Sequence, residues 1–260
     1  MTDARNGAGL ATVRNASHLL QQFTYDQPVL GVSELARRLD LGKSTVHRLL
    51  TTLAGEGFVQ RTPDGRYRLG LRLYELGQLV VNSLELREVA HPILESLRNE
   101  TRETVHLAVL EGVDVVYIER FESPSTLRLF GRLGRRMPAH STSSGKCLLA
   151  FSTRDVVEAV VGAGLTRLAP RTITRRNVLR RALEQVRRDG YACSSDESEP
   201  GVASVGAPVF GHDGSVIAAV SVAGPSSRLT QESIPTYARM VRRAADGISS
   251  GMGHRQRRVV

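Results

Sequence analysis

A short polar stretch in the first quarter of the chain combines the residue types that contact nucleic acid. Apolar residues recur at helical spacing between residues 43 and 54, which predicts an amphipathic helix. Its apolar positions are Val46, Leu49, Leu50 and Leu53. The opposite face carries hydroxyl, imidazole and cationic side chains, namely Lys43, Ser44, Thr45, His47, Arg48 and Thr51. Because short hydroxyls bind phosphates and longer donors reach base edges, we interpret this segment as a helix that reads duplex DNA, with a solvated surface helix as the alternative.

Three arginines surround a hairpin that is predicted to follow this helix. The period of the sequence changes from 3.6 to 2, and a Thr-Pro-Asp-Gly turn separates two short expected strands, 58–61 and 66–69. Guanidinium groups on such a hairpin can reach a DNA backbone or minor groove. We therefore expect Arg61, Arg66 and Arg68 to anchor the duplex.

A shorter helix is expected before the DNA-reading helix, over residues 34–39, with Ser33 as its N-cap. An Asp-Leu-Gly turn links the two helices, and Ser33 is included among the expected DNA contacts. Two helices on a glycine-containing turn, followed by a hairpin, are typical of a winged helix-turn-helix. This domain is expected over residues 10–70, after a disordered segment at residues 1–9.

A second candidate site is the hydroxyl-rich segment at residues 140–145, which precedes a helix expected to begin at Lys146. Free backbone N–H groups and the positive end of a helix dipole suit a carboxylate or another small anion. An ordinary helix cap is the alternative interpretation of the same residues.

An enzyme is the main rival class, because Ser143 and Lys146 match the S-x-x-K pattern of serine acyl-transferring enzymes. Neither S-D-N nor K-T-G accompanies this match, and G-x-S-x-G does not occur. Cys147 lies in an apolar stretch and is interpreted as a core residue, and the histidines show no metal-ligand spacing. An RNA-binding or architectural protein is disfavoured because only 5% of residues are aromatic and tryptophan is absent.

The composition is that of a basic globular protein of one or two domains. The chain has 260 residues, of which 41% are hydrophobic, and a formal net charge of +9. A basic balance favours a polyanionic partner, although the dominance of arginine over lysine also fits a GC-rich coding bias. Two distant cysteines, no apolar leader and no long apolar run predict a cytoplasmic protein with no membrane association and no disulfide. No cofactor is expected.

The rest of the chain alternates between helical and strand periods without the regular order of a parallel sheet. A linker helix is expected at residues 71–83, an effector-binding domain at 84–250 and a basic disordered tail at 251–260. Within this domain, helices are expected at residues 86–97, 146–151, 154–161, 177–188 and 234–248. Strands are expected at residues 104–110, 115–120, 126–130, 201–210 and 215–223. Ser152 and Asp155 form a capping-box pattern ahead of the helix expected at 154–161.

Many short motifs in a fixed order resemble the IclR family of transcription regulators. In the first domain these motifs are Ser33–Leu39, Leu41–Leu50 and Gly65–Gly70. In the second they are Arg87–Ala90, Thr104–Ala108, Gly134–His140, Gly145–Lys146, Gly190–Ala192, Glu199–Val202, Ala207–Phe210 and Ser221–Ser226. The resemblance covers about residues 10–250. It implies an α+β protein with an N-terminal winged helix-turn-helix and a C-terminal GAF-like α/β effector domain with a mainly antiparallel sheet.

The resemblance also implies where a small-molecule effector binds. The implied contacts are Met137, Ser143, Ser144, Ser194, Ser204 and Ser221, with Leu127 and Ala223 as apolar walls. Serines stand at 194 and 195 where an acidic pair is common, Ser204 stands where cysteine can occur, and Ala223 replaces a frequent serine. A small organic acid or hydroxylated aromatic is therefore expected. The resemblance thus implies a dimeric or tetrameric regulator, which we expect to be a repressor, whose binding to a double-stranded DNA operator is controlled by an effector.

Overall fold

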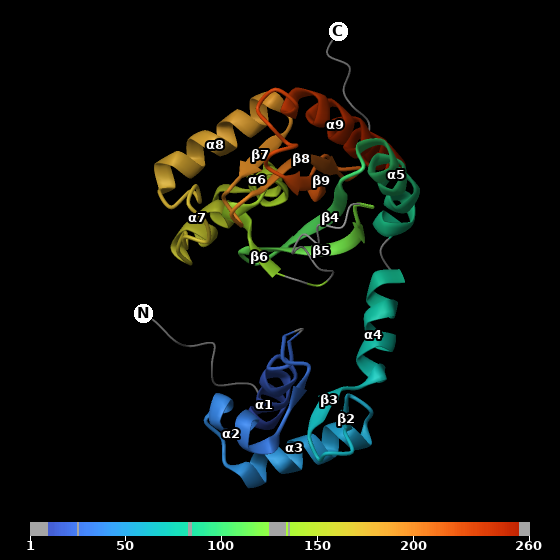
Figure 1. Cartoon of the computed structure of the whole chain (residues 1–260), viewed down its shortest axis with the longest axis vertical. Coiled ribbons are helices and arrows are strands. Elements are labelled where there is room, and N and C mark those ends of the chain that lie inside the picture. The colour runs from blue at the N-terminus through green and yellow to red at the C-terminus, as the bar shows by residue number, and fades with distance from the viewer. Residues whose placement is uncertain (1–9, 25, 83–84, 125–133, 135, 255–260) are drawn as a thin grey trace. The chain divides into compact units, whose positions relative to one another are not determined.

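The computed structural model describes residues 10–24, 26–82, 85–124, 134 and 136–254. The chain divides into two compact units, residues 1–83 and 84–260, which are considered separately (Figure 1). The expected disorder at residues 1–9, the expected strand at 126–130 and the candidate wall residue Leu127 lie outside the described residues.

The first unit is a small helical domain closed by a three-stranded sheet. Its elements are α1 (Ala11–Leu20), β1 (Val29–Leu30), α2 (Val32–Leu39), α3 (Lys43–Gly55), β2 (Val59–Arg61), β3 (Tyr67–Leu69) and α4 (Leu71–Asn82). The strands are antiparallel in the order β1-β3-β2. One apolar core joins α1, α2, α3 and the sheet, and its most buried members include Leu19, Leu35 and Leu50. The winged helix-turn-helix prediction is confirmed.

The N-cap expected at Ser33 is wrong. Helix α2 begins at Val32, and the extended Gly31 is its N-cap, because the N–H of Leu35 already donates to the carbonyl of Gly31 at 3.0 Å. Ser33 therefore lies exposed in the first turn of the helix. The two-residue strand β1 was not expected, since a segment this short shows no periodicity.

The turn between α2 and α3 sets the position of the DNA-reading helix. Asp40 adopts a left-handed conformation (φ 51°) at the C-terminus of α2, and Leu41 N–H then donates to Ala36 O at 3.0 Å. Gly42 is extended and begins α3. The four leucine and valine positions predicted for the inner face of α3 are all buried.

The second unit is a six-stranded sheet covered by helices. Its elements are α5 (Glu85–Thr101), β4 (Thr104–Glu111), β5 (Asp114–Phe121), β6 (Arg136–Pro138), the 3-10 turn η1 (Ala139–Ser141), α6 (Ser143–Phe151), α7 (Arg154–Gly162), α8 (Arg176–Asp189), β7 (Ala192–Ser195), β8 (Val202–Phe210), β9 (Val216–Pro225) and α9 (Ile234–Gly251). The strand order is β6-β5-β4-β9-β8-β7, and each of these pairings is antiparallel, as predicted.

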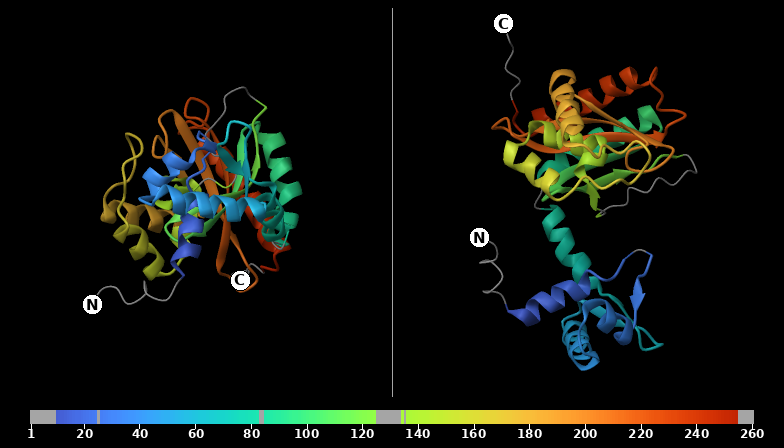
Figure 2. Two further views of the ribbon diagram at one scale, coloured as in Figure 1. Left: turned by 90° about the horizontal axis from the view of Figure 1, so that it is seen from below. Right: turned by 90° about the vertical axis from the view of Figure 1, so that its left-hand side faces the viewer.

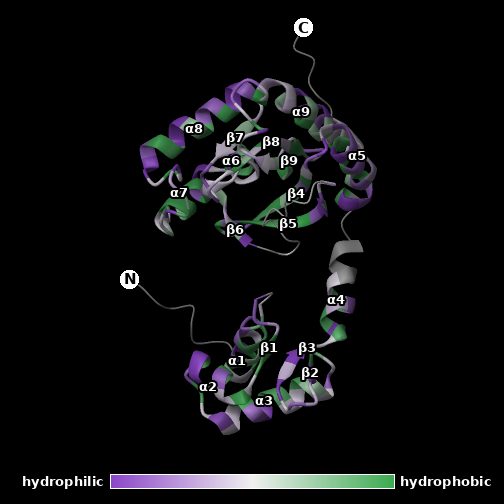
Figure 3. Cartoon of the chain, viewed as in Figure 1, coloured by the Kyte–Doolittle hydropathy of each residue, from purple (hydrophilic) through white to green (hydrophobic). Residues whose placement is uncertain are grey.

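Helices cover both faces of this sheet (Figure 2). Val105, Leu107 and Val220 share a core with α5 and α9, whereas Ala108 and Ala219 share a second core with α6, α7 and α8. Successive residues of β4 and β9 thus alternate between the two cores. Figure 3 shows the resulting hydrophobic colour along β4 and β5 and the mixed stretches along α8.

Several predicted boundaries in this unit were wrong. Helix α6 begins at Ser143, three residues earlier than expected, and the strand β6 and the turn η1 ahead of it were not predicted. The capping box at Ser152 does not form: Thr153 is the N-cap of α7, and Ser152 Oγ instead donates to Leu148 O at 2.8 Å. At the C-terminus, Gly251 ends α9 and His254 Nδ1 lies 3.1 Å from Gly211 O, so both belong to the fold although they were assigned to the tail.

Candidate nucleic-acid interface and ligand site

The outer face of α3 is polar and open to solvent. All six side chains predicted to read DNA are exposed: Lys43, Ser44, Thr45, His47, Arg48 and Thr51. On a helical wheel, Ser44, Arg48 and Thr51 lie opposite the buried apolar face. The N-terminal half of this face offers hydroxyl, imidazole and guanidinium donors to a groove or a phosphate.

A local hydrogen bond determines whether the hydroxyl of Thr51 can donate to DNA. Thr51 Oγ1 donates to His47 O at 2.9 Å, so this hydroxyl is left to accept from a ligand rather than to donate. Thr45 and Arg48 also border a groove of about 390 Å³ between α3 and α1, where Thr12 and Val13 form the opposite wall.

The three hairpin arginines play different parts. Arg66 Nη2 donates to Val29 O at 2.6 Å and ties β3 to β1. Arg68 donates from Nε and Nη2 to Gln60 Oε1, at 3.1 and 2.9 Å, across the β2–β3 pair. The side chains of Arg66 and Arg68 stay exposed, so they can contact a duplex with their remaining donors. Arg61 is also exposed, and it forms no ion pair within the described part of the chain.

In the second unit, the structure brings five of the predicted effector residues together. Ser143 Oγ donates to Ser204 Oγ at 2.8 Å, and Ser144 Oγ donates to Ser221 Oγ at 2.9 Å. Ser194 Oγ donates to the carbonyl of Ser141 at 3.0 Å. The first turn of α6 is therefore hydrogen-bonded directly to β8 and β9, with β7 beside it.

The two described apolar candidates, Ala223 and Met137, lie in different surroundings. Ala223 is paired with Ser204 in the β8–β9 register, so it borders the cluster and is 8% exposed. Met137 lies in β6, opposite Val115 of β5, and packs against the core beneath α6 and α7.

Two residues near Ser221, His106 and Arg120, were not predicted from the sequence, and the register of the sheet reveals them. His106 of β4 is paired with Ser221 of β9, and Arg120 of β5 is paired with His106. His106 is 3% exposed, and the centroid of its ring lies 4.5 Å from that of Tyr117. Strand alternation could have placed these side chains on the face of Ser221, but only once the strand order was known.

The N-terminus of α6 is held in place by its own capping residues. Thr142 is the N-cap, and its Oγ1 accepts a hydrogen bond from Gly145 N at 2.9 Å. Gly145 also packs directly on η1, since a Cβ there would lie 2.1 Å from the carbonyl oxygen of Ala139. These contacts fix the serines that face β8 and β9.

Lys146 does not serve Ser143 in the way that an acyl-transferring enzyme requires. Its Nζ lies 2.6 Å from Glu197 Oε1, in a pair that is almost fully buried. Desolvation raises the pKa of Glu197, with Lys146 acting in the opposite direction. Burial also raises the pKa of the Cys147 thiol, which lies in the core as predicted. Among the described residues, no group of three His, Cys, Asp or Glu side chains is placed to hold a metal ion.

Two family models match separate parts of this chain. The IclR helix-turn-helix domain matches residues 12–63, and the model named Bacterial transcriptional regulator IclR C-terminal matches residues 78–250. The chain belongs to the IclR family. As an IclR-family member it is a DNA-binding transcription regulator with an effector-binding C-terminal domain, which confirms the function predicted from the sequence.

Relatives within the IclR family match nearly the whole chain. The regulator XynR of Escherichia coli is 35% identical over 94% of this chain and 98% of its own length. KdgR of the same organism is 38% identical over 86% of each chain. The crystal structure of an IclR homologue from Microbacterium hydrocarbonoxydans, complexed with 4-hydroxybenzoate, superimposes with a TM-score of 0.84 at 33% identity and covers 93% of this chain and 99% of its own. No described helix combines the length and the hydropathy needed to cross a bilayer.

Proposed function

We propose that this regulator is a repressor that binds a palindromic operator as a homodimer or a dimer of dimers. The exposed polar face of α3 is the observation that carries this proposal, because it presents its donors where a recognition helix meets the major groove. Two such helices would enter successive major grooves about 34–36 Å apart. A relative from Klebsiella pneumoniae, AllR, 34% identical over 94% of this chain, is named a transcriptional repressor.

In this proposal, the α3 residues divide between base edges and phosphates. Arg48 and His47 are long enough to reach base edges, whereas Lys43, Ser44 and Thr45 lie at the helix N-terminus, where phosphates bind. Thr51 accepts rather than donates. Ser33 of α2 and the arginines at 61, 66 and 68 would contact the DNA backbone on either side of α3.

The effector would bind at the hydroxyl cluster between α6, β8 and β9. Each serine hydroxyl can both donate and accept, so a ligand carboxylate or phenol can replace a serine–serine hydrogen bond without leaving a buried polar group unpaired. The first turn of α6 adds backbone N–H donors and the positive end of its dipole. These features support a small organic acid or hydroxylated aromatic, the class to which the 4-hydroxybenzoate of the Microbacterium complex belongs.

Replacing Arg48 by alanine should relax operator preference. If the guanidinium is bidentate to a guanine, its loss removes about 1–3 kcal/mol of discrimination, or about 5- to 150-fold. The measurement is a competition assay between the promoter-proximal DNA of the chain's own gene and a scrambled duplex. Arg239→Ala, which removes an exposed arginine from α9, is the matched control and should leave the preference unchanged. An unchanged preference in Arg48→Ala would remove Arg48 from the reading surface.

Ser144→Leu should abolish the response to effector while leaving operator affinity near that of the wild type. The leucine side chain would occupy the space between α6 and β9 where Ser144 now meets Ser221. Thermal shift with 4-hydroxybenzoate and with small aliphatic acids measures the response, because a bound ligand raises the unfolding temperature by mass action.

Ser221→Ala is the milder companion to Ser144→Leu, since it removes one hydroxyl without adding volume. It should weaken the same thermal shift, whereas Ser250→Ala, at an exposed position of α9, should not. A full ligand response in both Ser144→Leu and Ser221→Ala would place the effector elsewhere.

Light scattering of the same proteins reports whether the chain is a dimer or a tetramer.

A further inference from the structure

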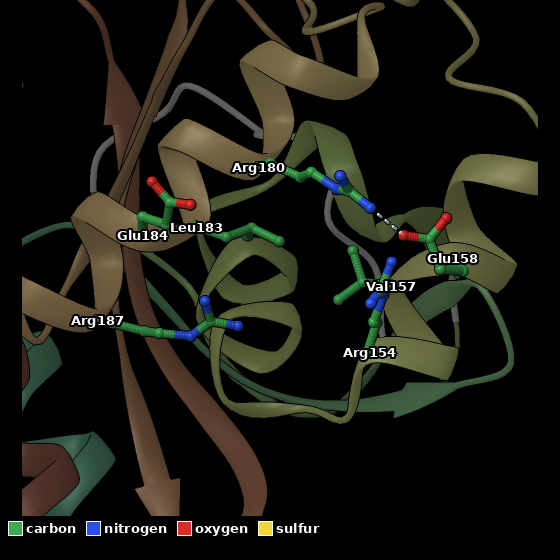
Figure 4. Close-up of a pocket in the computed structure, with 7 residues that line it drawn as sticks. All are labelled: Arg154, Val157, Glu158, Arg180, Leu183, Glu184 and Arg187. Carbon is green, nitrogen blue, oxygen red and sulfur yellow. Dashed lines mark hydrogen bonds and ion pairs between the residues drawn. The ribbon is translucent and has the colours of Figure 1, made fainter.

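A groove between α7 and α8 is lined by arginines and lies away from the serines of the effector site. It encloses about 400 Å³, and its lining residues are Arg154, Val157, Glu158, Arg180, Leu183, Glu184 and Arg187 (Figure 4). A volume of this order accommodates a small organic ligand. None of these residues has a part in the proposed operator contacts or in the hydroxyl cluster.

The floor of the groove is apolar and its walls are cationic. Val157 and Leu183 are 7% and 2% exposed and belong to the core that supports α6. In Figure 4, Arg180 and Arg187 extend from α8 and Arg154 extends from α7 around the same opening. An anionic ligand with a short carbon skeleton would place its carbons on the floor and its charges at the walls.

Two of the three arginines are held in place by the protein. Arg187 Nε donates to the carbonyl of Ala150, which leaves its two terminal nitrogens for a ligand. Arg180 Nη2 lies 2.6 Å from Glu158 Oε1. Arg154, at the first position of α7, is exposed and forms no ion pair with any of the described residues.

The acidic groups in the groove do not cancel this charge. Glu158 is shared between Arg176 and Arg180, and hydrogen bonds from both arginines lower its pKa, so it stays ionised and already paired. Glu184 lines the groove and Asp155 lies beside it on α7, both exposed. The groove lining holds three arginines against two glutamates, and one of these glutamates, Glu158, is also paired with Arg176 outside the lining.

We propose that this groove binds a small organic polyanion, one that carries a phosphate or at least two carboxylates, at a site separate from the effector site. Arginine suits such a ligand because its planar guanidinium binds two oxygens of a carboxylate or phosphate at once. A concave site with a hydrophobic floor and converging guanidiniums fits a compact ligand better than the even surface of a duplex backbone.

The test uses the full-length protein and isothermal titration with citrate, inorganic phosphate and acetate at constant ionic strength. Citrate or phosphate should bind saturably at a site that Arg154→Gln weakens, whereas any binding of the monovalent acetate should be the same in this variant and in the wild type. The citrate and phosphate arms distinguish a carboxylate ligand from a phosphate ligand. Arg154→Gln should weaken the binding by at least about tenfold, because a charge-assisted hydrogen bond is lost at an exposed position of the groove.

Arg239→Gln on α9 is the matched control and should bind the anions like the wild type. Absence of saturable binding, or equal loss in the two variants, would overturn the proposal. A lower affinity of Arg154→Gln for duplex DNA without an operator, together with no binding of the small anions, would also overturn it and assign the groove to DNA. The effector site is also proposed to take a carboxylate, so only anion binding that is weakened in Arg154→Gln and kept in Ser221→Ala is assigned to the groove.

Discussion

Replacing Lys146 by methionine should destabilise the second domain by about 3–5 kcal/mol, because it leaves the buried carboxylate of Glu197 without its cationic partner. Glu197 Oε1 would lose its partner at 2.6 Å, and in the described structure Glu197 Oε2 already has no hydrogen-bond partner. Methionine keeps most of the volume of the lysine stem, so the loss reports charge rather than packing. Denaturant unfolding of the two proteins measures the difference.

The double variant Lys146→Met, Glu197→Gln is the control for this loss. Removing both charges should restore most of the stability, since a buried pair replaced by neutral groups of similar volume is often close to neutral. If the double variant is as unstable as the single one, the contribution comes from packing and the ion pair is incidental.

The deficit of Lys146→Met should also depend on pH. Burial raises the pKa of Glu197 in the folded protein, and loss of the lysine raises it further. A carboxyl with a raised folded pKa contributes stability that is fully present below its unfolded pKa and is lost as the pH rises through the folded value. The deficit should therefore be smaller at about pH 5 than at about pH 8. A deficit that is constant across this range would contradict the assignment to Glu197.

Gly145→Ala should destabilise the second domain by about 3 kcal/mol or more, at the upper end of what overpacking costs. Its Cβ would lie 2.1 Å from the carbonyl oxygen and 2.5 Å from the Cα of Ala139, and neither is the end of a flexible side chain. Helix α6 or η1 must then shift. Thermal unfolding should show a decrease in Tm of about 6–12 °C for a domain of this size.

Gly162→Ala separates this steric effect from the general cost of a glycine substitution. Gly162 is the last residue of α7, and no atom lies within 4 Å of the position of an added Cβ. Its replacement should change stability by less than about 1 kcal/mol. Similar decreases in Tm for the two variants would mean that the contact between α6 and η1 does not resist the added methyl group.

The first domain could be predicted closely because its signals are local. The spacing of Val46, Leu49 and Leu53 defines α3, and a Pro-Asp-Gly turn defines the hairpin. The N-cap at Ser33 was misplaced because serine and glycine are both good N-caps, and only the backbone hydrogen bond from Leu35 to Gly31 decides between them.

The second domain was harder to predict because its site depends on strand order. Ser194 and Ser195 in β7 show no hydrophobic alternation, so no strand was predicted there. The partnership of Ser144 with Ser221 joins residues 77 positions apart, and no local pattern indicates it. The family resemblance supplied the serines, whereas the register of β4, β5 and β9 was needed to place His106 and Arg120 on the same face.

The central pairing of β4 with β9 also has a consequence for synthesis of the chain. Between the end of β4 at Glu111 and the start of β9 at Val216 lie 104 residues. At about 5–20 residues per second, the ribosome needs roughly 5–20 s to make them, and during that time β4 has β5 on one side and an open edge on the other. Open strand edges pair with other chains. Nascent or truncated forms that end before β9 should therefore aggregate, and the exposed edge of β4 is most in need of chaperone protection during this interval.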